Sequence, residues 1–196
     1  MTGIILAGGE SSRMGKDKAF LDLAGKPLIE HVMNTLQSVF GSIIIVTNTP
    51  QRFAAYDAVV VTDVFSKRGP LTGIYSGMRS SSSEYNFVVA CDMPYLNRDL
   101  ITYMAGLAEG YDAVVPAPGD FLEPLHAIYC RALLPLMERQ IEQGNQRIRK
   151  IFPDLRIRYI RESEIDRFDP GRKSFKNLNT PQEYEEAACA DWECRN

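Results

Sequence analysis

Residues 1–18 read MTGIILAGGESSRMGKDK. The stretch opens with apolar residues that are typical of a buried strand. From Leu6 to Lys18 it becomes a segment of three glycines, two serines and several charged side chains, with Met14 as its one large apolar residue after Leu6. Such a segment loses much backbone entropy when it is ordered and adds little to a core. Its cost predicts a ligand-binding loop at the end of a strand.

The chemistry of this loop favours a polyphosphate. Glycines let the backbone approach closely and point N–H groups at an anion, while Arg13, Lys16 and Lys18 supply positive charge. The Walker motif is excluded because five residues, not four, separate Gly9 from the Gly-Lys pair, and an acidic residue follows the lysine. The dinucleotide motif Gly-x-Gly-x-x-Gly is absent from this stretch as well. These spacings disfavour a P-loop ATPase and a dehydrogenase.

Short apolar runs rich in Ile and Val alternate with segments of helical period, a pattern that predicts a three-layer α/β domain with a parallel sheet buried on both faces. The second half is less regular. We expect strands at Gly3–Leu6, Ser42–Thr47, Ala58–Thr62, Asn86–Ala90, Ala113–Val115, Leu125–Cys130 and Leu155–Ile160. We expect helices at Pro27–Phe40, Leu71–Arg79, Asp99–Leu107, Ala132–Gln143 and from Thr180 onward, and a loop at Arg161–Arg172.

The length of 196 residues predicts one domain over 1–186 with a C-terminal extension over 187–196. No apolar run approaches the ~20 residues of a membrane span, and the first residues lack a signal-peptide pattern, so we expect a cytoplasmic protein that does not enter a membrane. A net charge of −3 argues against a nucleic-acid-binding surface. The four cysteines match neither a zinc pattern nor a disulfide framework.

Polar residues follow several of the expected strands. Asn48, Asp63 and Asp92 each come directly after one of them, and in a parallel sheet the carboxyl ends of strands meet at the edge where ligands bind. Mg²⁺ is usually held by one or two carboxylates together with substrate phosphates and water. We therefore expect Asp92 to hold a magnesium ion beside the glycine-rich loop, with Asp63 as a candidate second ligand.

Several motifs resemble those of one family. LAGGESSRMGKDK resembles the signature of sugar-nucleotide-type nucleotidyltransferases, and its ending RMGKDK is similar to that of the molybdenum cofactor guanylyltransferases. That family's later motifs resemble, in the same order, GPLTG (69–73), CDMPY (91–95), PLHAIY (124–129) and NLNTPQEY (177–184). The resemblance covers nearly the whole chain. It implies a three-layer Rossmann-like nucleotidyltransferase fold with a mostly parallel central sheet and an irregular second half.

The resemblance also implies a reaction. GTP would give GMP to molybdenum-bound molybdopterin and release pyrophosphate, with Mg²⁺ as the cofactor. The terminal phosphate of the pterin would attack the α-phosphate in line, and because that phosphate is already ionised near neutral pH, no general base is required. Transient contact with molybdoenzymes or other cofactor-handling proteins is compatible with this reaction, since a labile product is best handed over directly.

By matching position, the resemblance assigns roles to individual residues. Relative to some members the loop lacks one glycine, which makes Lys18 a more secure phosphate contact than Lys16. The nucleotide-binding residues would be Leu6, Ala7, Gly8, Gly9, Lys18, Asn48, Asp63 and Asp92. The catalytic residues would be Arg13, Lys18 and Asp92, the metal ligand Asp92, and the pterin contacts His126 and Asn179.

Each assigned residue also has a structural interpretation. Asp92 is suited to cap the following helix, Asp63 to close a turn, and Asn48, before Thr-Pro, to form another turn. His126 lies on an expected strand, where a lone histidine is more often a hydrogen-bonded structural residue. Asn179 is equally suited to the entry of the last helix.

Residue types alone leave the choice of base open. A cytidylyltransferase acting on the same pterin, or a transferase that activates a sugar or alcohol phosphate, would need the same loop and carboxylate. A nucleotide sensor or cofactor carrier would keep the loop without needing the metal carboxylate. A scaffold for cofactor insertion would bind its target without nucleotide.

Overall fold

The computed structural model describes residues 1–8, 18–179 and 183–184. In this part of the chain the strands are β1 (Thr2–Leu6), β2 (Asp22–Leu23), β3 (Lys26–Pro27), β4 (Ile43–Val46), β5 (Val59–Val61), β6 (Tyr85–Ala90), β7 (Ala113–Ala117), β8 (His126–Cys130) and β9 (Ile157–Arg161). The α-helices are α1 (Leu28–Gln37), α2 (Pro70–Ser80), α3 (Arg98–Gly106), α4 (Leu134–Glu142) and α5 (Glu162–Ile165). Short 3-10 helices are η1 (Lys18–Phe20), η2 (Pro50–Phe53), η3 (Arg131–Leu133), η4 (Ile148–Lys150), η5 (Phe152–Asp154) and η6 (Lys173–Phe175).

Seven strands form the central sheet in the order β5-β4-β1-β6-β8-β7-β9. β1 pairs in parallel with β4 on one side and with β6 on the other. β8 is antiparallel to both of its neighbours, and β9 is again parallel to β7. The predicted mostly parallel sheet is therefore confirmed, with one reversed strand in the less regular second half.

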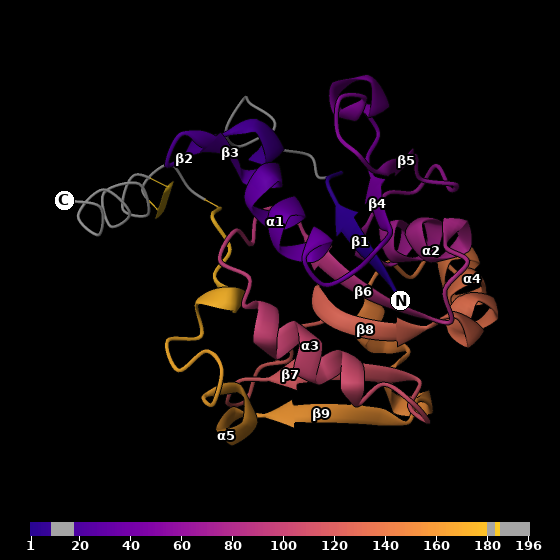
Figure 1. Cartoon of the computed structure of the whole chain (residues 1–196). Coiled ribbons are helices and arrows are strands. Elements are labelled where there is room, and N and C mark those ends of the chain that lie inside the picture. The colour runs from indigo at the N-terminus through magenta and orange to yellow at the C-terminus, as the bar shows by residue number, and fades with distance from the viewer. Residues whose placement is uncertain (9–17, 180–182, 185–196) are drawn as a thin grey trace.

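Helices cover both faces of this sheet (Figure 1). Helices α1 and α3 pack on one face, where Ile5 and Val89 point, and α2 and α4 pack on the other, where Ile4 and Val88 point. Successive residues of β1 and β6 point to opposite faces, and both faces are buried, which explains why these strands are continuous apolar runs. The three-layer α/β architecture is confirmed.

The predicted elements differ from the observed ones in a few places. The expected helix Pro27–Phe40 begins one residue later, because Pro27 pairs with Asp22 in the small β2–β3 hairpin. The expected helix Ala132–Gln143 is divided into η3 and α4. The expected loop Arg161–Arg172 was wrong in part, since it contains α5, whose Ile165 side chain is buried in the core.

The beginning of the last helix, Thr180–Pro181, and the expected extension over 187–196 lie outside the described residues. No helix in the described part of the chain is long and apolar enough to cross a membrane.

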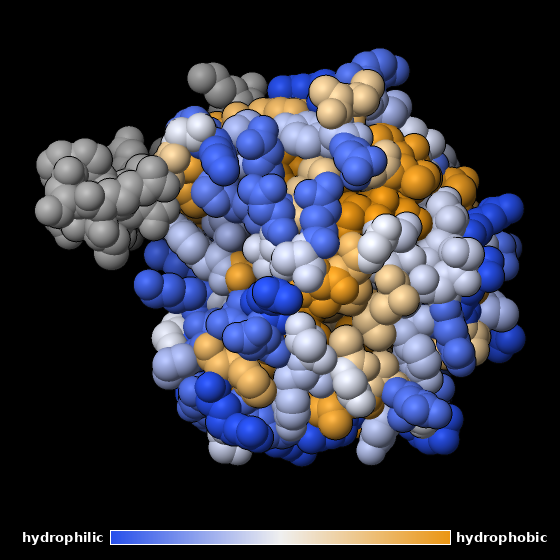
Figure 2. All heavy atoms as spheres, in the orientation of Figure 1, coloured by the Kyte–Doolittle hydropathy of each residue, from blue (hydrophilic) through white to orange (hydrophobic). Residues whose placement is uncertain are grey.

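The edge strand β5 leaves apolar side chains on the surface. Val59 is 54% exposed and Val64, just beyond the strand, is 48% exposed. Figure 2 shows a group of apolar atoms in the region of β5, at the upper right, and further apolar atoms near the middle of this face. Strand β4, by contrast, is fully buried, so the exposed apolar surface belongs to the edge of the sheet and not to its centre.

A close contact between α2 and the sheet depends on Gly77. A Cβ atom at this position would lie 2.5 Å from Ile4 Cγ2 and 3.0 Å from Val46 Cγ2. We expect Gly77→Ala to lower the free energy of unfolding by about 1–3 kcal/mol through overpacking, although alanine favours helices. Gly106→Ala in α3 is the matched control, because a Cβ added there would meet no other part of the described chain within 4 Å. Urea denaturation of both variants checks this; equal stabilities would contradict the close contact.

Candidate nucleotide site

The carboxyl ends of four neighbouring strands form one rim of the sheet. In spatial order these ends carry Asp63 after β5, Asn48 after β4, Ala7 and Gly8 after β1, and Asp92 after β6. Backbone hydrogen bonds hold the rim together, with Ala7 N–H donating to Val46 O at 2.8 Å and Cys91 N–H to Leu6 O at 3.1 Å. The predicted convergence of these residues is confirmed by the parallel pairing.

One end of the rim offers a carboxylate oxygen without a partner. Asn48 Nδ2 donates to Asp63 Oδ2 at 2.9 Å, so the amide fixes the orientation of the carboxylate. Asp63 Oδ1 is buried and accepts no hydrogen bond from any residue in the described ranges. A buried acceptor left unpaired costs free energy, and it is a position where a ligand donor would be stabilising.

Two glycines lie close to the Asp63 carboxylate. A Cβ added at Gly8 would lie 3.6 Å from Asn48 Nδ2, so Gly8 is directly beside the Asn48–Asp63 pair. A Cβ added at Gly73, in the first turns of α2, would lie 3.3 Å from Leu6 Cδ2 and 3.9 Å from Asp63 Oδ1. Leu6, Gly8, Asn48 and Asp63 therefore line one compact corner.

The other end of the rim carries the charged groups. Lys18 Nζ lies 3.6 Å from Asp92 Oδ2, and both side chains are about one-fifth exposed, at 22% and 19%. Burial raises the pKa of the Asp92 carboxyl above its ordinary value, and the nearby Lys18 ammonium partly offsets this shift. Lys18 thus favours the ionised carboxylate in a partly desolvated position.

The C-terminal segment completes this end of the rim. Lys18 Nζ donates a hydrogen bond to Asn179 Oδ1 at 2.7 Å, and Leu178 N–H donates to Asp92 O at 2.9 Å. Residues near both ends of the chain therefore meet at Asp92. The sequence predicts a role for Asn179 but not for Leu178. The one feature of the sequence that marks Leu178 is its position as an apolar residue between two asparagines.

The donor set at Asp92 fits a hard divalent cation in part. A carboxylate oxygen is the ligand type that Mg²⁺ prefers, and Mg²⁺ normally takes the rest of its ligands from water and substrate phosphates. No group of three or more His, Cys, Asp or Glu side chains among the described residues could hold a metal by itself. Asp63 follows β5, which is separated from β6 by β4 and β1, and its carboxylate is bonded to Asn48. Of these two carboxylates, Asp92 is therefore the one beside Lys18.

His126 lies in the core beneath the rim. Its ring is 0% exposed and packs edge-on against Phe87 and Phe175, with 5.0 Å between ring centroids in each case. Neither ring nitrogen has a hydrogen-bond partner in the described part of the chain, so the expectation of a hydrogen-bonded structural histidine was wrong. Direct contact with a pterin stays a prediction, and in this structure the ring is fully buried.

Gly9, Arg13 and Lys16 lie outside the described residues, and their predicted contacts with phosphate stay predictions. Apart from His126, which is buried in the core, the structure brings the other predicted residues together in two groups. The first consists of Leu6, Ala7, Gly8, Asn48 and Asp63, and the second of Lys18, Asp92 and Asn179.

The fold and the site define the class of the protein. A mostly parallel α/β sheet carries Ala7 and Gly8, where the glycine-rich stretch of the sequence begins, a lysine and a partly buried carboxylate at its carboxyl edge, which is the arrangement of a nucleotidyltransferase. The comparisons with known proteins agree: residues 3–159 match the family described as "MobA-like NTP transferase domain". The chain therefore belongs to the MobA-like NTP transferase family, as the resemblance of its motifs predicted.

Curated relatives match over nearly their whole length. A protein of Desulfosudis oleivorans named molybdenum cofactor guanylyltransferase is 43% identical, with 97% of this chain and 95% of the relative covered. The protein of the same name from Syntrophotalea carbinolica is 37% identical, with 94% and 89% covered.

Solved structures share the fold. Molybdopterin-guanine dinucleotide biosynthesis protein A from Archaeoglobus fulgidus superposes with a TM-score of 0.87 at 28% identity, covering 98% of this chain and all of that one. A 4-diphosphocytidyl-2C-methyl-D-erythritol synthase from Anaerococcus prevotii gives a TM-score of 0.72 at 12% identity, with 97% of each chain covered. The second likeness shows the fold alone.

The buried histidine predicts a pH dependence of stability. Burial lowers the pKa of His126 to about 3, while the Asp169 charge acts in the opposite direction. In the unfolded chain the pKa is about 6.5, so between these values the unfolded state binds the extra proton and the folded state does not. The free energy of unfolding should therefore fall as the pH drops from about 6.5 towards 3, by up to ~1.4 kcal/mol per pH unit.

Denaturation of the wild type and His126→Phe between pH 7 and pH 4 measures this contribution. We expect the free energy of unfolding of the wild type to fall relative to that of the variant as the pH drops, because the variant lacks the titrating group. Parallel curves for the two proteins would contradict the assignment.

Proposed function

We propose that the protein transfers GMP from GTP to molybdenum-bound molybdopterin and releases pyrophosphate, with Mg²⁺ as the cofactor. Full-length relatives named molybdenum cofactor guanylyltransferase support the substrates. The observation that carries the proposal is the contact of Lys18 with Asp92 and Asn179, which puts a cation and a carboxylate together beside the strand that leads into the glycine-rich loop.

The two groups of the rim suggest how GTP lies. Asp63 Oδ1, which has no hydrogen-bond partner among the described residues, can accept from an N–H or O–H group of a guanine nucleoside, and Gly8 leaves room for that nucleoside beside Asn48. Strands β4 and β6 are two strand spacings apart, on the order of 10 Å, so a nucleotide held at Asn48 would extend its phosphates towards Asp92.

At the phosphate end the chain's own groups would stabilise charge. Lys18 is positioned to contact the phosphoryl oxygens, and Arg13 is proposed to do the same from the glycine-rich loop. Asp92 would hold Mg²⁺, which when bound polarises the α-phosphate and offsets the charge of the departing pyrophosphate. Asn179, at 2.7 Å from Lys18, would orient the lysine and face the acceptor.

A cytidylyltransferase on the same pterin is not favoured, because the curated relatives at 37–43% identity carry the guanylyltransferase name. Contacts with molybdoenzymes stay a proposal that rests on the chemistry of a labile product. A nucleotide sensor or a scaffold for cofactor insertion is also not favoured, because neither function needs the Asp92 carboxylate beside Lys18.

An assay with four nucleotides tests the proposed function. The pure protein is incubated with molybdenum-bound molybdopterin, Mg²⁺ and one of GTP, CTP, ATP or UTP, and the dinucleotide product is separated by chromatography. We expect product from GTP at a rate well above that from the other three. Product from CTP but not from GTP would refute the proposal, and product that forms equally without added divalent metal would refute the role of Mg²⁺.

Asp92→Asn tests the role of the carboxylate. The substitution keeps the size of the side chain but removes the charge, so we expect turnover to fall by roughly 100-fold or more while GTP binding changes little. Turnover with acceptor and isothermal titration with GTP give the two numbers. Asp99→Asn is the matched control, because Asp99 is an exposed carboxylate in the first turn of α3. Unchanged turnover in Asp92→Asn would refute the assigned role.

A further inference from the structure

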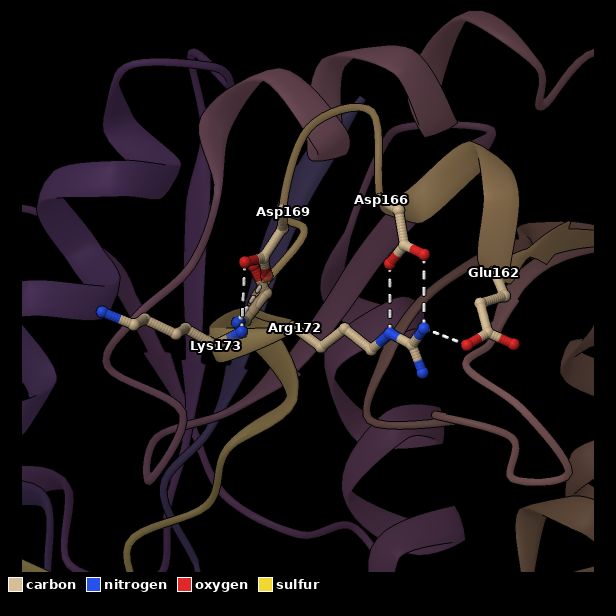
Figure 3. Close-up of polar contacts among 6 residues, drawn as sticks. Glu162, Asp166, Asp169, Arg172 and Lys173 are labelled. Carbon is tan, nitrogen blue, oxygen red and sulfur yellow. Dashed lines mark hydrogen bonds and ion pairs between the residues drawn. The ribbon is translucent and has the colours of Figure 1, made fainter.

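Residues 166–179, which we name the strap, run from the end of α5 to Asn179 at the rim. At one corner of the strap, Arg172 adopts a left-handed conformation with φ of 51°. Its guanidinium pairs with Asp166, at 3.1 Å from Nε to Oδ1, and with Glu162 (Figure 3). Arg172 is about one-third exposed and Asp166 slightly more, so these ion pairs lie at the surface, where their contribution to stability is small.

A second carboxylate of the strap is buried instead. Asp169 is 8% exposed, and its two oxygens accept hydrogen bonds from the backbone N–H groups of Lys173 at 3.1 Å and Ser174 at 2.8 Å (Figure 3). No ion pair joins Asp169 to any residue in the described ranges. Charge-assisted hydrogen bonds of this kind are stronger than neutral ones, so Asp169 holds the backbone of η6 in place.

The η6 turn is in turn attached to the core. Ser174 is fully buried, and its Oγ accepts a hydrogen bond from Asn97 N–H at 3.0 Å. Asn97 Nδ2 donates to Phe168 O at 2.9 Å, so the residue that caps α3 holds the strap at two points. The ring of Phe175 packs against buried His126.

Beyond Phe175 the strap reaches the reacting end of the site. The Leu178 side chain is 1% exposed and packs with Leu23 and Leu28, while its N–H donates to Asp92 O at 2.9 Å. The next residue, Asn179, accepts the hydrogen bond from Lys18. The strap thus supplies one bond to the backbone of the carboxylate residue and one to the phosphate lysine.

We propose that Asp169 is a positioning residue for the acceptor half of the active site. It acts through η6 on Leu178 and Asn179, and through them on Asp92 and Lys18. Asn48 and Asp63 lie at the other end of the rim, after β4 and β5, so the nucleoside end of the site does not depend on the strap. This role rests on the proposed function, and Asp169 lies outside the sequence motifs that resemble those of the family.

Steady-state kinetics of Asp169→Ala test this separation. Loss of the two backbone contacts should shift Asn179 and Lys18, and we expect kcat/KM for the acceptor to fall roughly 10- to 100-fold. The KM for GTP should rise by a much smaller factor than kcat/KM for the acceptor falls, because the strap reaches Lys18 at the phosphates but not the nucleoside contacts at Asn48 and Asp63. The matched control is Met137→Ala in α4, a fully buried position on the opposite face of the sheet, which destabilises the protein without reaching the strap.

Two further variants separate Asp169 from the surface ion pairs. Asp169→Asn keeps the size and one acceptor oxygen, so we expect activity between that of the wild type and that of Asp169→Ala. Arg172→Gly removes both ion pairs but permits the left-handed backbone, and we expect its acceptor kinetics to stay near those of the wild type. A loss in Arg172→Gly as large as in Asp169→Ala would overturn the assignment to Asp169, as would equal losses in Asp169→Ala and Met137→Ala.

A readout without substrate keeps this inference separate from the proposed function. We expect Asp169→Ala to speed hydrogen exchange at the Leu178 amide and to increase amine labelling of Lys18, with exchange in β1 and β4 unchanged. Faster exchange at Leu178 with unchanged acceptor kinetics would overturn the positioning role, and unchanged exchange and labelling would overturn the link through the strap. Absence of GMP transfer by the wild type would instead refute the proposed function, because exchange and labelling measure the strap directly.

Discussion

The parallel pairing of β1 with β4 and with β6 is the constraint on which the site depends. Because β1 hydrogen-bonds on both sides, Ala7 and Gly8 must leave the sheet between Asn48 and Asp92. Both faces of β1 are buried, and a shift of one residue in register would exchange the side chains that face the two helix layers. Packing on both faces therefore fixes the register, and the register fixes the spacing between the end of the rim with Asn48 and Asp63 and the end with Asp92.

The second half of the chain closes the phosphate end of that rim. Strand β8 reverses direction, so its first residues lie beside the carboxyl end of β6, with Ala90 N–H donating to Leu125 O at 3.2 Å. The strap then returns to the same place and bonds to Asp92 and Lys18. One end of the rim, with Asn48 and Asp63, is thus built on parallel strands, and the other end, with Asp92 and Lys18, is completed by the irregular C-terminal segment.

The sequence predicts those parts of this arrangement that depend on local properties, such as apolar runs and the polar residues that follow them. The apolar runs at β1, β4 and β6 are buried on both faces, and the residues that follow parallel strands must meet at one edge, which placed Asn48, Asp63 and Asp92 correctly. The prediction of a loop at Arg161–Arg172 was wrong in part, because its few apolar residues give no period. α5 is held by the burial of Ile165 and by contacts such as Arg158 to Glu164.

The sequence by itself determined the class of fold and the kind of chemistry, because alternating apolar runs, a glycine-rich cationic loop and a carboxylate after a strand each reflect local requirements. Tertiary structure alone decided which groups meet. Lys18 and Asn179 are 161 residues apart, and no periodicity links them. Asp169 likewise looks like an ordinary polar residue in the sequence, and only tertiary packing buries its carboxylate against the backbone of Lys173 and Ser174. His126 lies in a motif of the family, but only packing buries its ring beneath the rim. Long-range packing determines these positions, since burial and pairing depend on segments that the local sequence does not specify.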